Sequence, residues 1–247
     1  MKVYHLTYEP SYHSLDIHIW VKCNLDCKGC YTNFETQDFG LADDPVAEIL
    51  EKERAKPPQK FLSFDEVMEL IKGKKIKYAV FMGTEAGLDP EMPRLARALH
   101  DKFGSYNVIL TNGVKLFDTS DIDEIILSVK AYSGDIYRQY TGKSNHKVLD
   151  NFNKLAASGK KLQVETVFIP GLVETDEIEN IAKYIASVDK NIAFRIDAYF
   201  RVPGCPWPSA TKEQVEEAAE RAKKHLPNVN CLTLDMKRIG DKATRIF

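Results

Sequence analysis

The stretch that decides the fold is residues 17–33, IHIWVKCNLDCKGCYTN, where a mostly apolar run is followed by three cysteines. The run at 17–21 predicts a short buried strand. Cys23, Cys27 and Cys30 then lie in a polar loop just past the strand end, in the spacing C-x3-C-x2-C. Three thiolates on one loop can hold three irons of a [4Fe–4S] cluster and leave the fourth iron without a protein ligand. We therefore expect one iron–sulfur cluster with an open iron.

A zinc site and a redox thiol are the alternatives for these cysteines. Structural zinc usually has four ligands, often as two C-x2-C pairs, and the sequence has no second pair and no nearby histidine that obviously completes the set. The spacing favours the cluster over both alternatives. Cys205 and Cys231 lie apart from the loop and from each other, so we predict that they are ordinary thiols.

Length and composition limit the class of protein. The chain has 247 residues, a length that suits one α/β barrel-type domain or two small ones. Its formal net charge is −2, so it shows no basic character that would indicate nucleic-acid binding. No apolar run is long enough for a transmembrane helix, and the N-terminus has no apolar signal core. Five cysteines with three clustered argue against a secreted disulfide framework. We expect a soluble cytoplasmic protein, and an oxygen-poor, anaerobic cell would suit an exposed cluster.

Two segments stand outside the regular pattern. Residues 1–16 mix polar and aromatic side chains and indicate a surface lead-in. Residues 34–60 are polar and charged, and we interpret them as an insertion near the cluster. Asp44 and Pro45 could begin a short helix there. A solvated surface excursion and a lid or partner-docking role both remain open for this insertion.

From Ser63 onward, strands and helices alternate. Apolar runs predict strands at 78–82, 108–110, 125–129, 162–169 and 192–199, with a last edge strand at 230–234. Helical spacing follows Ser63, Asp89, Val148, Ile178 and Thr211. About six strand–helix units predict an α/β fold with a mostly parallel sheet covered by helices, and six are too few for an eight-stranded closed barrel. We expect a single domain over residues 1–247.

The cysteine spacing after a first strand resembles that of the radical S-adenosylmethionine (radical SAM) enzymes. The resemblance implies a partial (β/α)6 barrel, a [4Fe–4S] cluster and SAM, whose amino and carboxylate groups bind the open iron. It also implies an electron donor such as ferredoxin or flavodoxin. In this architecture ligands bind beyond the carboxyl ends of the strands.

Several strand ends resemble the SAM-binding positions of that family. Gly83, Thr84 and Glu85 resemble the element that receives the SAM amino group, although Thr84 replaces a glycine. Lys130 ends a strand and could meet the SAM carboxylate, the alternative being a salt bridge to Glu85 or another acid. Thr111 and Asn112 also follow a strand at a position like those that bind SAM in that family. Alternatively, their side chains could form an ordinary turn. The expected SAM-binding residues are Tyr31, Gly83, Thr84, Glu85, Thr111, Asn112, Lys130, Val167, Ile169, Asp197 and Tyr199.

One branch of the family is especially similar. The segments TGKSN at 141–145 and VFIPG at 167–171 resemble those of glycyl-radical-enzyme activating enzymes of the pyruvate formate-lyase activase type. The resemblance spans roughly residues 15–205 outside the insertion, and it implies a backbone glycine of a partner protein as substrate. The chain departs from that branch at Leu110 and Ser128, where the activase has acids beside a cation, at Glu165, where it has arginine, and at Phe200, where it has histidine.

Three functions follow as hypotheses. The first is an activase-like enzyme in which a 5′-deoxyadenosyl radical abstracts hydrogen from a glycine of a partner protein. The second is a radical SAM reaction on a small metabolite or a peptide, such as a deazapurine-type ring contraction or a peptide crosslink. The third, from another class, is a non-catalytic iron–sulfur or zinc-binding module.

Overall fold

The structure is a computed structural model that describes residues 1–34, 37–43, 53–237 and 239–247. The helix expected from Asp44 and Pro45 lies outside the described residues.

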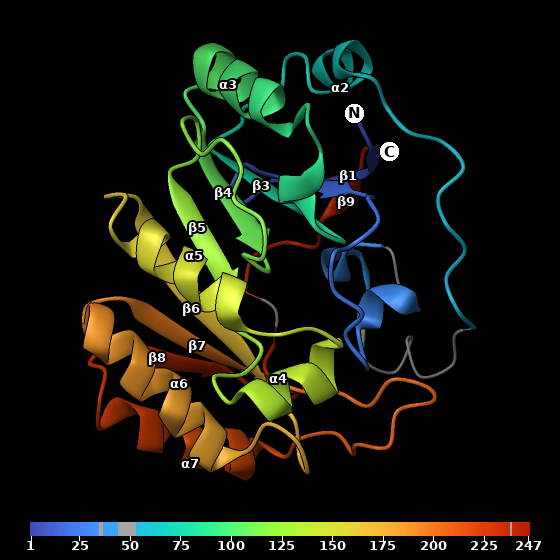
Figure 1. Ribbon diagram of the computed structural model, residues 1–247. Helices are drawn as coiled ribbons and strands as arrows, with labels where there is room; N and C mark the ends of the chain where they lie inside the picture. Colours follow the sequence, from blue (N-terminus) through green and yellow to red (C-terminus); the bar gives the residue numbers. More distant parts are fainter. Residues whose placement is uncertain (35–36, 44–52, 238) are drawn as a thin grey trace.

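A single curved sheet of nine strands organises the described chain (Figure 1). The strand order is β8-β7-β6-β5-β4-β3-β2-β1-β9. Strands β2 to β8 are parallel, and β1 and β9 are antiparallel to their neighbours. The strands are β1 (Val3–Glu9), β2 (Ser14–Ile19), β3 (Tyr78–Gly83), β4 (Tyr106–Thr111), β5 (Glu124–Ser128), β6 (Lys161–Phe168), β7 (Ala193–Ala198), β8 (Val229–Leu232) and β9 (Thr244–Arg245).

Alternation along each strand separates the two faces of the sheet. In β6, Val164 and Phe168 are buried, whereas Glu165 and Val167 are half-buried. Successive side chains of a strand point to opposite faces, so the first pair packs under the helices and the second pair lies on the inner, concave face. Glu165 pairs with Arg195 of β7. Arg195 therefore lies beside Glu165 on the same inner face.

Helices cover the outer face of the sheet, while the cysteine loop lies on the opposite side (Figure 1). Two of them begin with capping boxes, at Ser63 with Glu66 and at Thr211 with Gln214. The helices are α2 (Phe64–Leu70), α3 (Met92–Phe103), α4 (Gly134–Thr141), α5 (His146–Ala156), α6 (Thr175–Val188) and α7 (Lys212–Lys223). Short 3₁₀ turns are η1 (Tyr31–Asn33), η2 (Phe39–Leu41) and η3 (Ala86–Leu88).

The expected partial barrel is confirmed, since the sheet is open and mostly parallel. The prediction for residues 1–16 was wrong. Most of that segment forms β1 and the start of β2, which pair with each other. The physical reason is non-local: Thr7 of β1 also pairs with Arg245 of β9, at the other end of the chain, and both termini lie together in Figure 1. Helix α4 was also not predicted. None of the helices in the described ranges combines the length and apolarity needed to cross a membrane.

Candidate functional site

The cysteine loop is fixed to the end of β3 by Thr84. Its hydroxyl donates to the Val21 carbonyl oxygen at 2.7 Å and accepts from the Val21 N–H at 3.0 Å. The preceding residue, Gly83, has φ of +116°, and a Cβ atom there would lie 2.2 Å from the Ile19 carbonyl oxygen. Only glycine allows β2 and β3 to approach this closely. The glycine and the threonine expected from the sequence therefore hold the start of the loop.

Helix α4 holds the other side of the loop. The Asp26 N–H donates to the Thr141 carbonyl oxygen at 3.1 Å, and the Lys28 N–H donates to the Tyr140 carbonyl oxygen at 2.9 Å. Carbonyl groups in the last turn of a helix have no partner within the helix. These two bonds therefore satisfy two carbonyl groups of α4 and two N–H groups of the loop. They flank Cys27 on either side.

Gly29 gives the loop a close contact with the segment after β7. Its φ is +77°, and a Cβ atom there would lie 2.9 Å from the Tyr199 hydroxyl and 3.4 Å from the Cys205 sulfur. Tyr199 is buried, as a residue packed against the loop should be. Cys205 therefore lies beside the cysteine loop, a proximity that the sequence separation gave no means of predicting.

The three loop cysteines are free thiols and half-buried. Polar groups surround their sulfurs: the Asn112 amide donates to Cys23 at 3.6 Å, and the Cys30 sulfur lies 3.0 Å from the Thr32 hydroxyl. Burial raises the pKa of Cys27 to about 12, and the charge of Lys130 opposes that shift. A metal would have to displace the proton, since the thiolate is the ligand.

Glu85 is a buried carboxylate beside the loop. It accepts the Thr111 hydroxyl at 2.6 Å and the Asn112 N–H at 2.8 Å. Burial raises the pKa of Glu85, while these hydrogen bonds and the charge of Lys130 oppose the shift. Asn112 in turn donates to Asn24 of the loop at 2.7 Å. Three of the expected residues, from the ends of β3 and β4, thus form one hydrogen-bonded group.

Lys130 follows β5 and is half-buried. In the described ranges it makes no hydrogen bond and no ion pair, so the expected alternative of a salt bridge to Glu85 is not formed. Burial lowers the pKa of Lys130, but the charges of Cys27, Glu165 and Cys30 outweigh it and the net shift is upward. A cation in this position is available to an anionic ligand.

An ion network lies on the inner face next to Lys130. Arg195 of β7 donates to Glu165 of β6, and it donates to Asp197 at 2.9 Å. Ser128 also donates to Glu165. Burial raises the pKa of Asp197 to about 6, with Arg195 opposing the shift. Arg195 is thus committed to two carboxylates.

The other expected residues lie in different surroundings. Tyr31 is 39% exposed, and its ring is tilted against that of Phe39 with the centroids 4.7 Å apart. Val167 is half-buried on the inner face. Ile169 is fully buried, and its N–H donates to the Val173 carbonyl oxygen at 2.9 Å. Of the two aliphatic residues expected to bind SAM, only Val167 therefore has exposed surface for a ligand.

Comparison with known proteins decides the family. The sequence profile of the Radical SAM superfamily matches residues 17–185, which is more than half of the chain. The chain belongs to this superfamily. It is an enzyme of a family that uses SAM and an iron–sulfur cluster.

Relatives of this radical SAM enzyme differ in what they do. A proposed glycyl-radical enzyme activating enzyme from Methanocaldococcus jannaschii is 30% identical over 87% of this chain and 79% of its own length. An S-adenosylmethionine-dependent nucleotide dehydratase from Lacinutrix mariniflava is 27% identical over 70% of this chain, which spans only 36% of that relative.

Solved structures support the radical SAM fold. SuiB of Streptococcus suis bound to S-adenosylmethionine superposes with a TM-score of 0.62 at 14% identity, covering 85% of this chain and 48% of SuiB. This chain therefore spans about half the length of that protein. QueE from Escherichia coli gives a TM-score of 0.56 at 14% identity, with 94% and 93% covered. At these identities the likeness concerns the fold alone.

The residues of this radical SAM enzyme fit the family's cofactors. Three free thiols lie on one loop, and a cluster holds its thiolates at separate corners of one body. Among the described residues, two further groups near the loop lack partners: the Lys130 ammonium and the hydroxyl of Tyr137, which is fully buried in α4. Tyr137 had no sequence signal, because the helix that carries it was not predicted.

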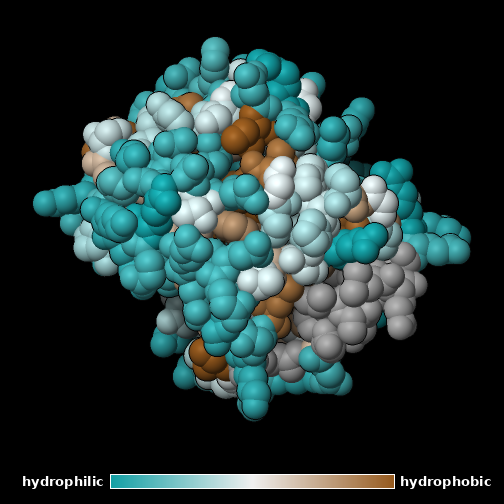
Figure 2. All heavy atoms as spheres, turned by 90° about the horizontal axis from the view of Figure 1, so that it is seen from below, coloured by the Kyte–Doolittle hydropathy of each residue, from teal (hydrophilic) through white to brown (hydrophobic). Residues whose placement is uncertain are grey.

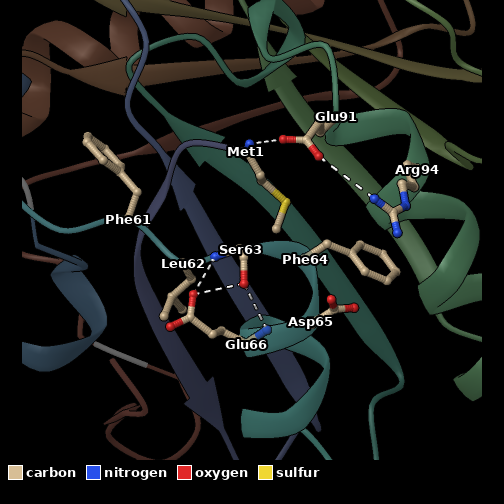
Figure 3. A pocket seen from close by; sticks show the side chains of 9 residues that line it. All are labelled: Met1, Phe61, Leu62, Ser63, Phe64, Asp65, Glu66, Glu91 and Arg94. Atoms are coloured by element: carbon tan, nitrogen blue, oxygen red, sulfur yellow. Dashed lines mark hydrogen bonds and ion pairs between the residues drawn. The ribbon is translucent and has the colours of Figure 1, made fainter.

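The enzyme has two further surface features, an apolar strip and a pocket. Seen from below, on the side of α4 and α7, apolar surface gathers in a narrow hollowed strip among hydrophilic side chains (Figure 2). Separately, a pocket near the N-terminus lies between α2 and α3 (Figure 3) and includes none of the cysteines. Met1 pairs with Glu91, Glu91 pairs with Arg94, and Glu66 accepts from the Ser63 hydroxyl. Its lining residues are Met1, Phe61, Leu62, Ser63, Phe64, Asp65, Glu66, Glu91 and Arg94.

Proposed function

We propose that Cys23, Cys27 and Cys30 hold a [4Fe–4S] cluster, with SAM bound between Glu85 and Lys130. The observation that carries the proposal is the half-buried Lys130, which lies beside the cysteine loop without an ion pair in the described part of the chain. Burying a lone charge is costly, so an anionic partner is expected there. The SAM carboxylate is such a partner.

The surrounding groups have complementary tasks. Glu85 is held by Thr111 and Asn112 beside the loop, where its carboxylate can accept from the SAM ammonium group. Thr84 and α4 fix the loop before the cofactor arrives. Further SAM contacts are proposed for Tyr31, Val167, Asp197 and Tyr199. When bound, a reduced cluster and SAM supply a 5′-deoxyadenosyl radical that abstracts hydrogen from substrate.

The proposed substrate is a glycine in a partner protein, and the likeness to the activating enzyme of M. jannaschii supports it. The inner face next to Lys130 supports a peptide over a nucleotide. Arg195 is neutralised by Glu165 and Asp197, so one net negative charge remains in that network. Once the SAM carboxylate pairs with Lys130, the described network has no cation left to bind a phosphate group. A ferredoxin or flavodoxin is the proposed electron donor.

The cluster assignment is tested with the full chain reconstituted anaerobically. After reduction and addition of SAM, we expect bound iron and sulfide, visible absorption and 5′-deoxyadenosine. Cys27→Ala should lose all of these signals. Cys231→Ala, in the edge strand β8, is the matched control and should keep them. A Cys27→Ala chain with the iron content of the parent would refute the assignment.

Substrate class is tested by isotope transfer. A peptide containing doubly deuterated glycine and a deuterated nucleoside triphosphate are offered separately to the loaded enzyme. Deuterium in 5′-deoxyadenosine from the peptide supports the activase-like function. Deuterium from the nucleotide alone would contradict it and favour the small-metabolite reaction.

A further inference from the structure

The hydroxyl of Tyr137 is a buried polar group that the proposed function leaves unexplained. The side chain is fully buried, and the hydroxyl has no hydrogen-bond partner among the described residues. An unsatisfied buried hydroxyl costs about 1–3 kcal/mol. Phenylalanine would fill the same space without that cost, so a missing partner is the simplest physical explanation of the tyrosine.

One hydroxyl of the same helix lies near Tyr137. Thr141, one turn later in α4, donates its proton to the Tyr137 carbonyl oxygen at 2.8 Å and accepts from the Lys143 N–H at 3.2 Å. Thr141 lowers the pKa of Tyr137 more weakly than burial and the neighbouring charges shift it, but the two hydroxyls do not meet in hydrogen-bond geometry in the described ranges.

The place of Tyr137 indicates what the missing partner is. Helix α4 lies on the cysteine loop through the backbone bonds of Asp26 and Lys28, which flank Cys27. Burial raises the pKa of Tyr137, the charges of Cys27 and Cys23 raise it further, and Lys130 opposes them. Tyr137 lies one turn before the helix end that binds the residues on either side of Cys27, where a cluster would bring sulfur atoms that accept hydrogen bonds.

We propose that the Tyr137 hydroxyl donates a hydrogen bond to cluster sulfur at the Cys27 corner and so tunes the reduction potential. The inference rests on the proposed cluster. Reduction adds negative charge to the cluster, and a hydrogen bond to sulfur stabilises the reduced form more than the oxidised one. Tyr137 is in this role a tuning residue and makes no contact with substrate.

The test compares Tyr137→Phe with the full wild-type chain, both reconstituted anaerobically. Redox titration followed by electron paramagnetic resonance should show a more negative midpoint potential in the variant at equal iron content. Pulsed resonance in light and heavy water should show an exchangeable proton coupled to the wild-type cluster and absent from the variant. Tyr184→Phe is the control, since the Tyr184 hydroxyl donates to the Leu149 carbonyl oxygen at 3.1 Å; its cluster should match the wild type.

Stability of the cluster-free chains separates tuning from structural support. Without the cluster, Tyr137→Phe should unfold at the wild-type denaturant concentration or above it, whereas Tyr184→Phe should unfold below it. An unchanged potential and proton coupling, or a cluster-free Tyr137→Phe chain that is destabilised or fails to fold, would overturn the inference alone. If neither wild type nor variant binds a cluster, the proposed function fails and the inference with it.

Discussion

At the scale of single residues, buried polar groups around the cysteine loop carry the most specific information. Thr84, Glu85 and Asn112 each join strand ends that lie far apart in the sequence. Each of these bonds lies in a half-buried or buried setting, where an unmade hydrogen bond is costly. Substitutions that keep the shape and remove the polar atom should therefore have measurable effects.

Thr84→Val tests the anchor of the loop. The change leaves the N–H and C=O of Val21 without their side-chain partner. We expect a loss of about 1–3 kcal/mol in the free energy of unfolding in urea, together with lower iron content after reconstitution. Thr84→Ser keeps the hydroxyl and should behave like the parent chain. Equal stability of the valine and serine variants would contradict the anchoring role.

The buried His5 should make the stability of the fold depend on pH. Burial and the neighbouring charge of His18 lower the pKa of His5 to about 4, although its Nδ1 lies 2.6 Å from the Phe247 carbonyl oxygen. His5 takes up a proton near pH 6.5 in the unfolded chain but only near pH 4 in the folded chain. The stability contributed by neutral His5 is therefore present above pH 6.5 and is lost as the pH falls from 6.5 to 4.

The predicted loss from His5 is about 2 kcal/mol between pH 7 and pH 5. Urea unfolding of the cluster-free chain at both pH values measures it. In His5→Phe the drop should be smaller by that amount, whereas a control substitution of the exposed His146 to Gln should leave it unchanged. An identical pH dependence for His5→Phe and wild type would disprove the assignment.

At the scale of elements, the close approach of β2 and β3 shapes the site. The register pairs Ile19 with Gly83, and the next residues on each strand begin the cysteine loop and the Thr84 anchor. On the opposite side, α4 meets the loop with its last carbonyl groups. The cysteine loop is thus held between a strand pair and a helix end by hydrogen bonds to its backbone.

Gly83→Ala tests the strand pair. The added Cβ would lie 2.2 Å from the Ile19 carbonyl oxygen, a distance that forces the two backbones apart. Gly104→Ala is the matched control, because Gly104 also has positive φ but a Cβ there meets nothing within 4 Å. We expect about 1–2 kcal/mol of destabilisation for Gly104→Ala and clearly more for Gly83→Ala in urea unfolding. Equal losses would show that β2 and β3 can separate at little cost.

At the scale of the whole molecule, the open sheet gathers residues from most of the chain at one edge. Parallel strands with helical connections bring their carboxyl ends together, so the ends of β2, β3, β4 and β5 supply the cysteine loop, Glu85, Asn112 and Lys130. A ligand that binds at these ends contacts four neighbouring strands at once. Ligand binding should therefore stabilise the molecule as a unit.

SAM binding provides the corresponding test. At a free SAM concentration of 100 times Kd, the cluster-loaded chain should gain about 2.7 kcal/mol in the free energy of unfolding, seen as a rise in melting temperature under anaerobic conditions. Cys27→Ala should show no rise. Stabilisation of that variant equal to the parent would mean that SAM binds without the cluster, contrary to the proposed site.

The sequence by itself was enough to predict the cysteine chemistry of the loop and a mostly parallel, open sheet. Cysteine spacing and apolar periodicity are local properties, and they were enough to predict three cluster ligands, a mostly parallel open fold and the candidate residues at the strand ends. Local pattern also misled: residues 1–16 lacked a clear strand signal, because the pairing of β1 depends on β9 at the far end of the chain.

Only the tertiary structure decided how these parts meet. It placed Thr84 against Val21, α4 on the cysteine loop, Cys205 beside Gly29, and the unpartnered hydroxyl of Tyr137 on the side of Cys27. It also left Lys130 unpaired in the described ranges while Arg195 binds two carboxylates. Hydrogen bonds and ion pairs of this kind join residues on different strands and helices. Their partners are set by strand register and helix packing, which no local spacing specifies.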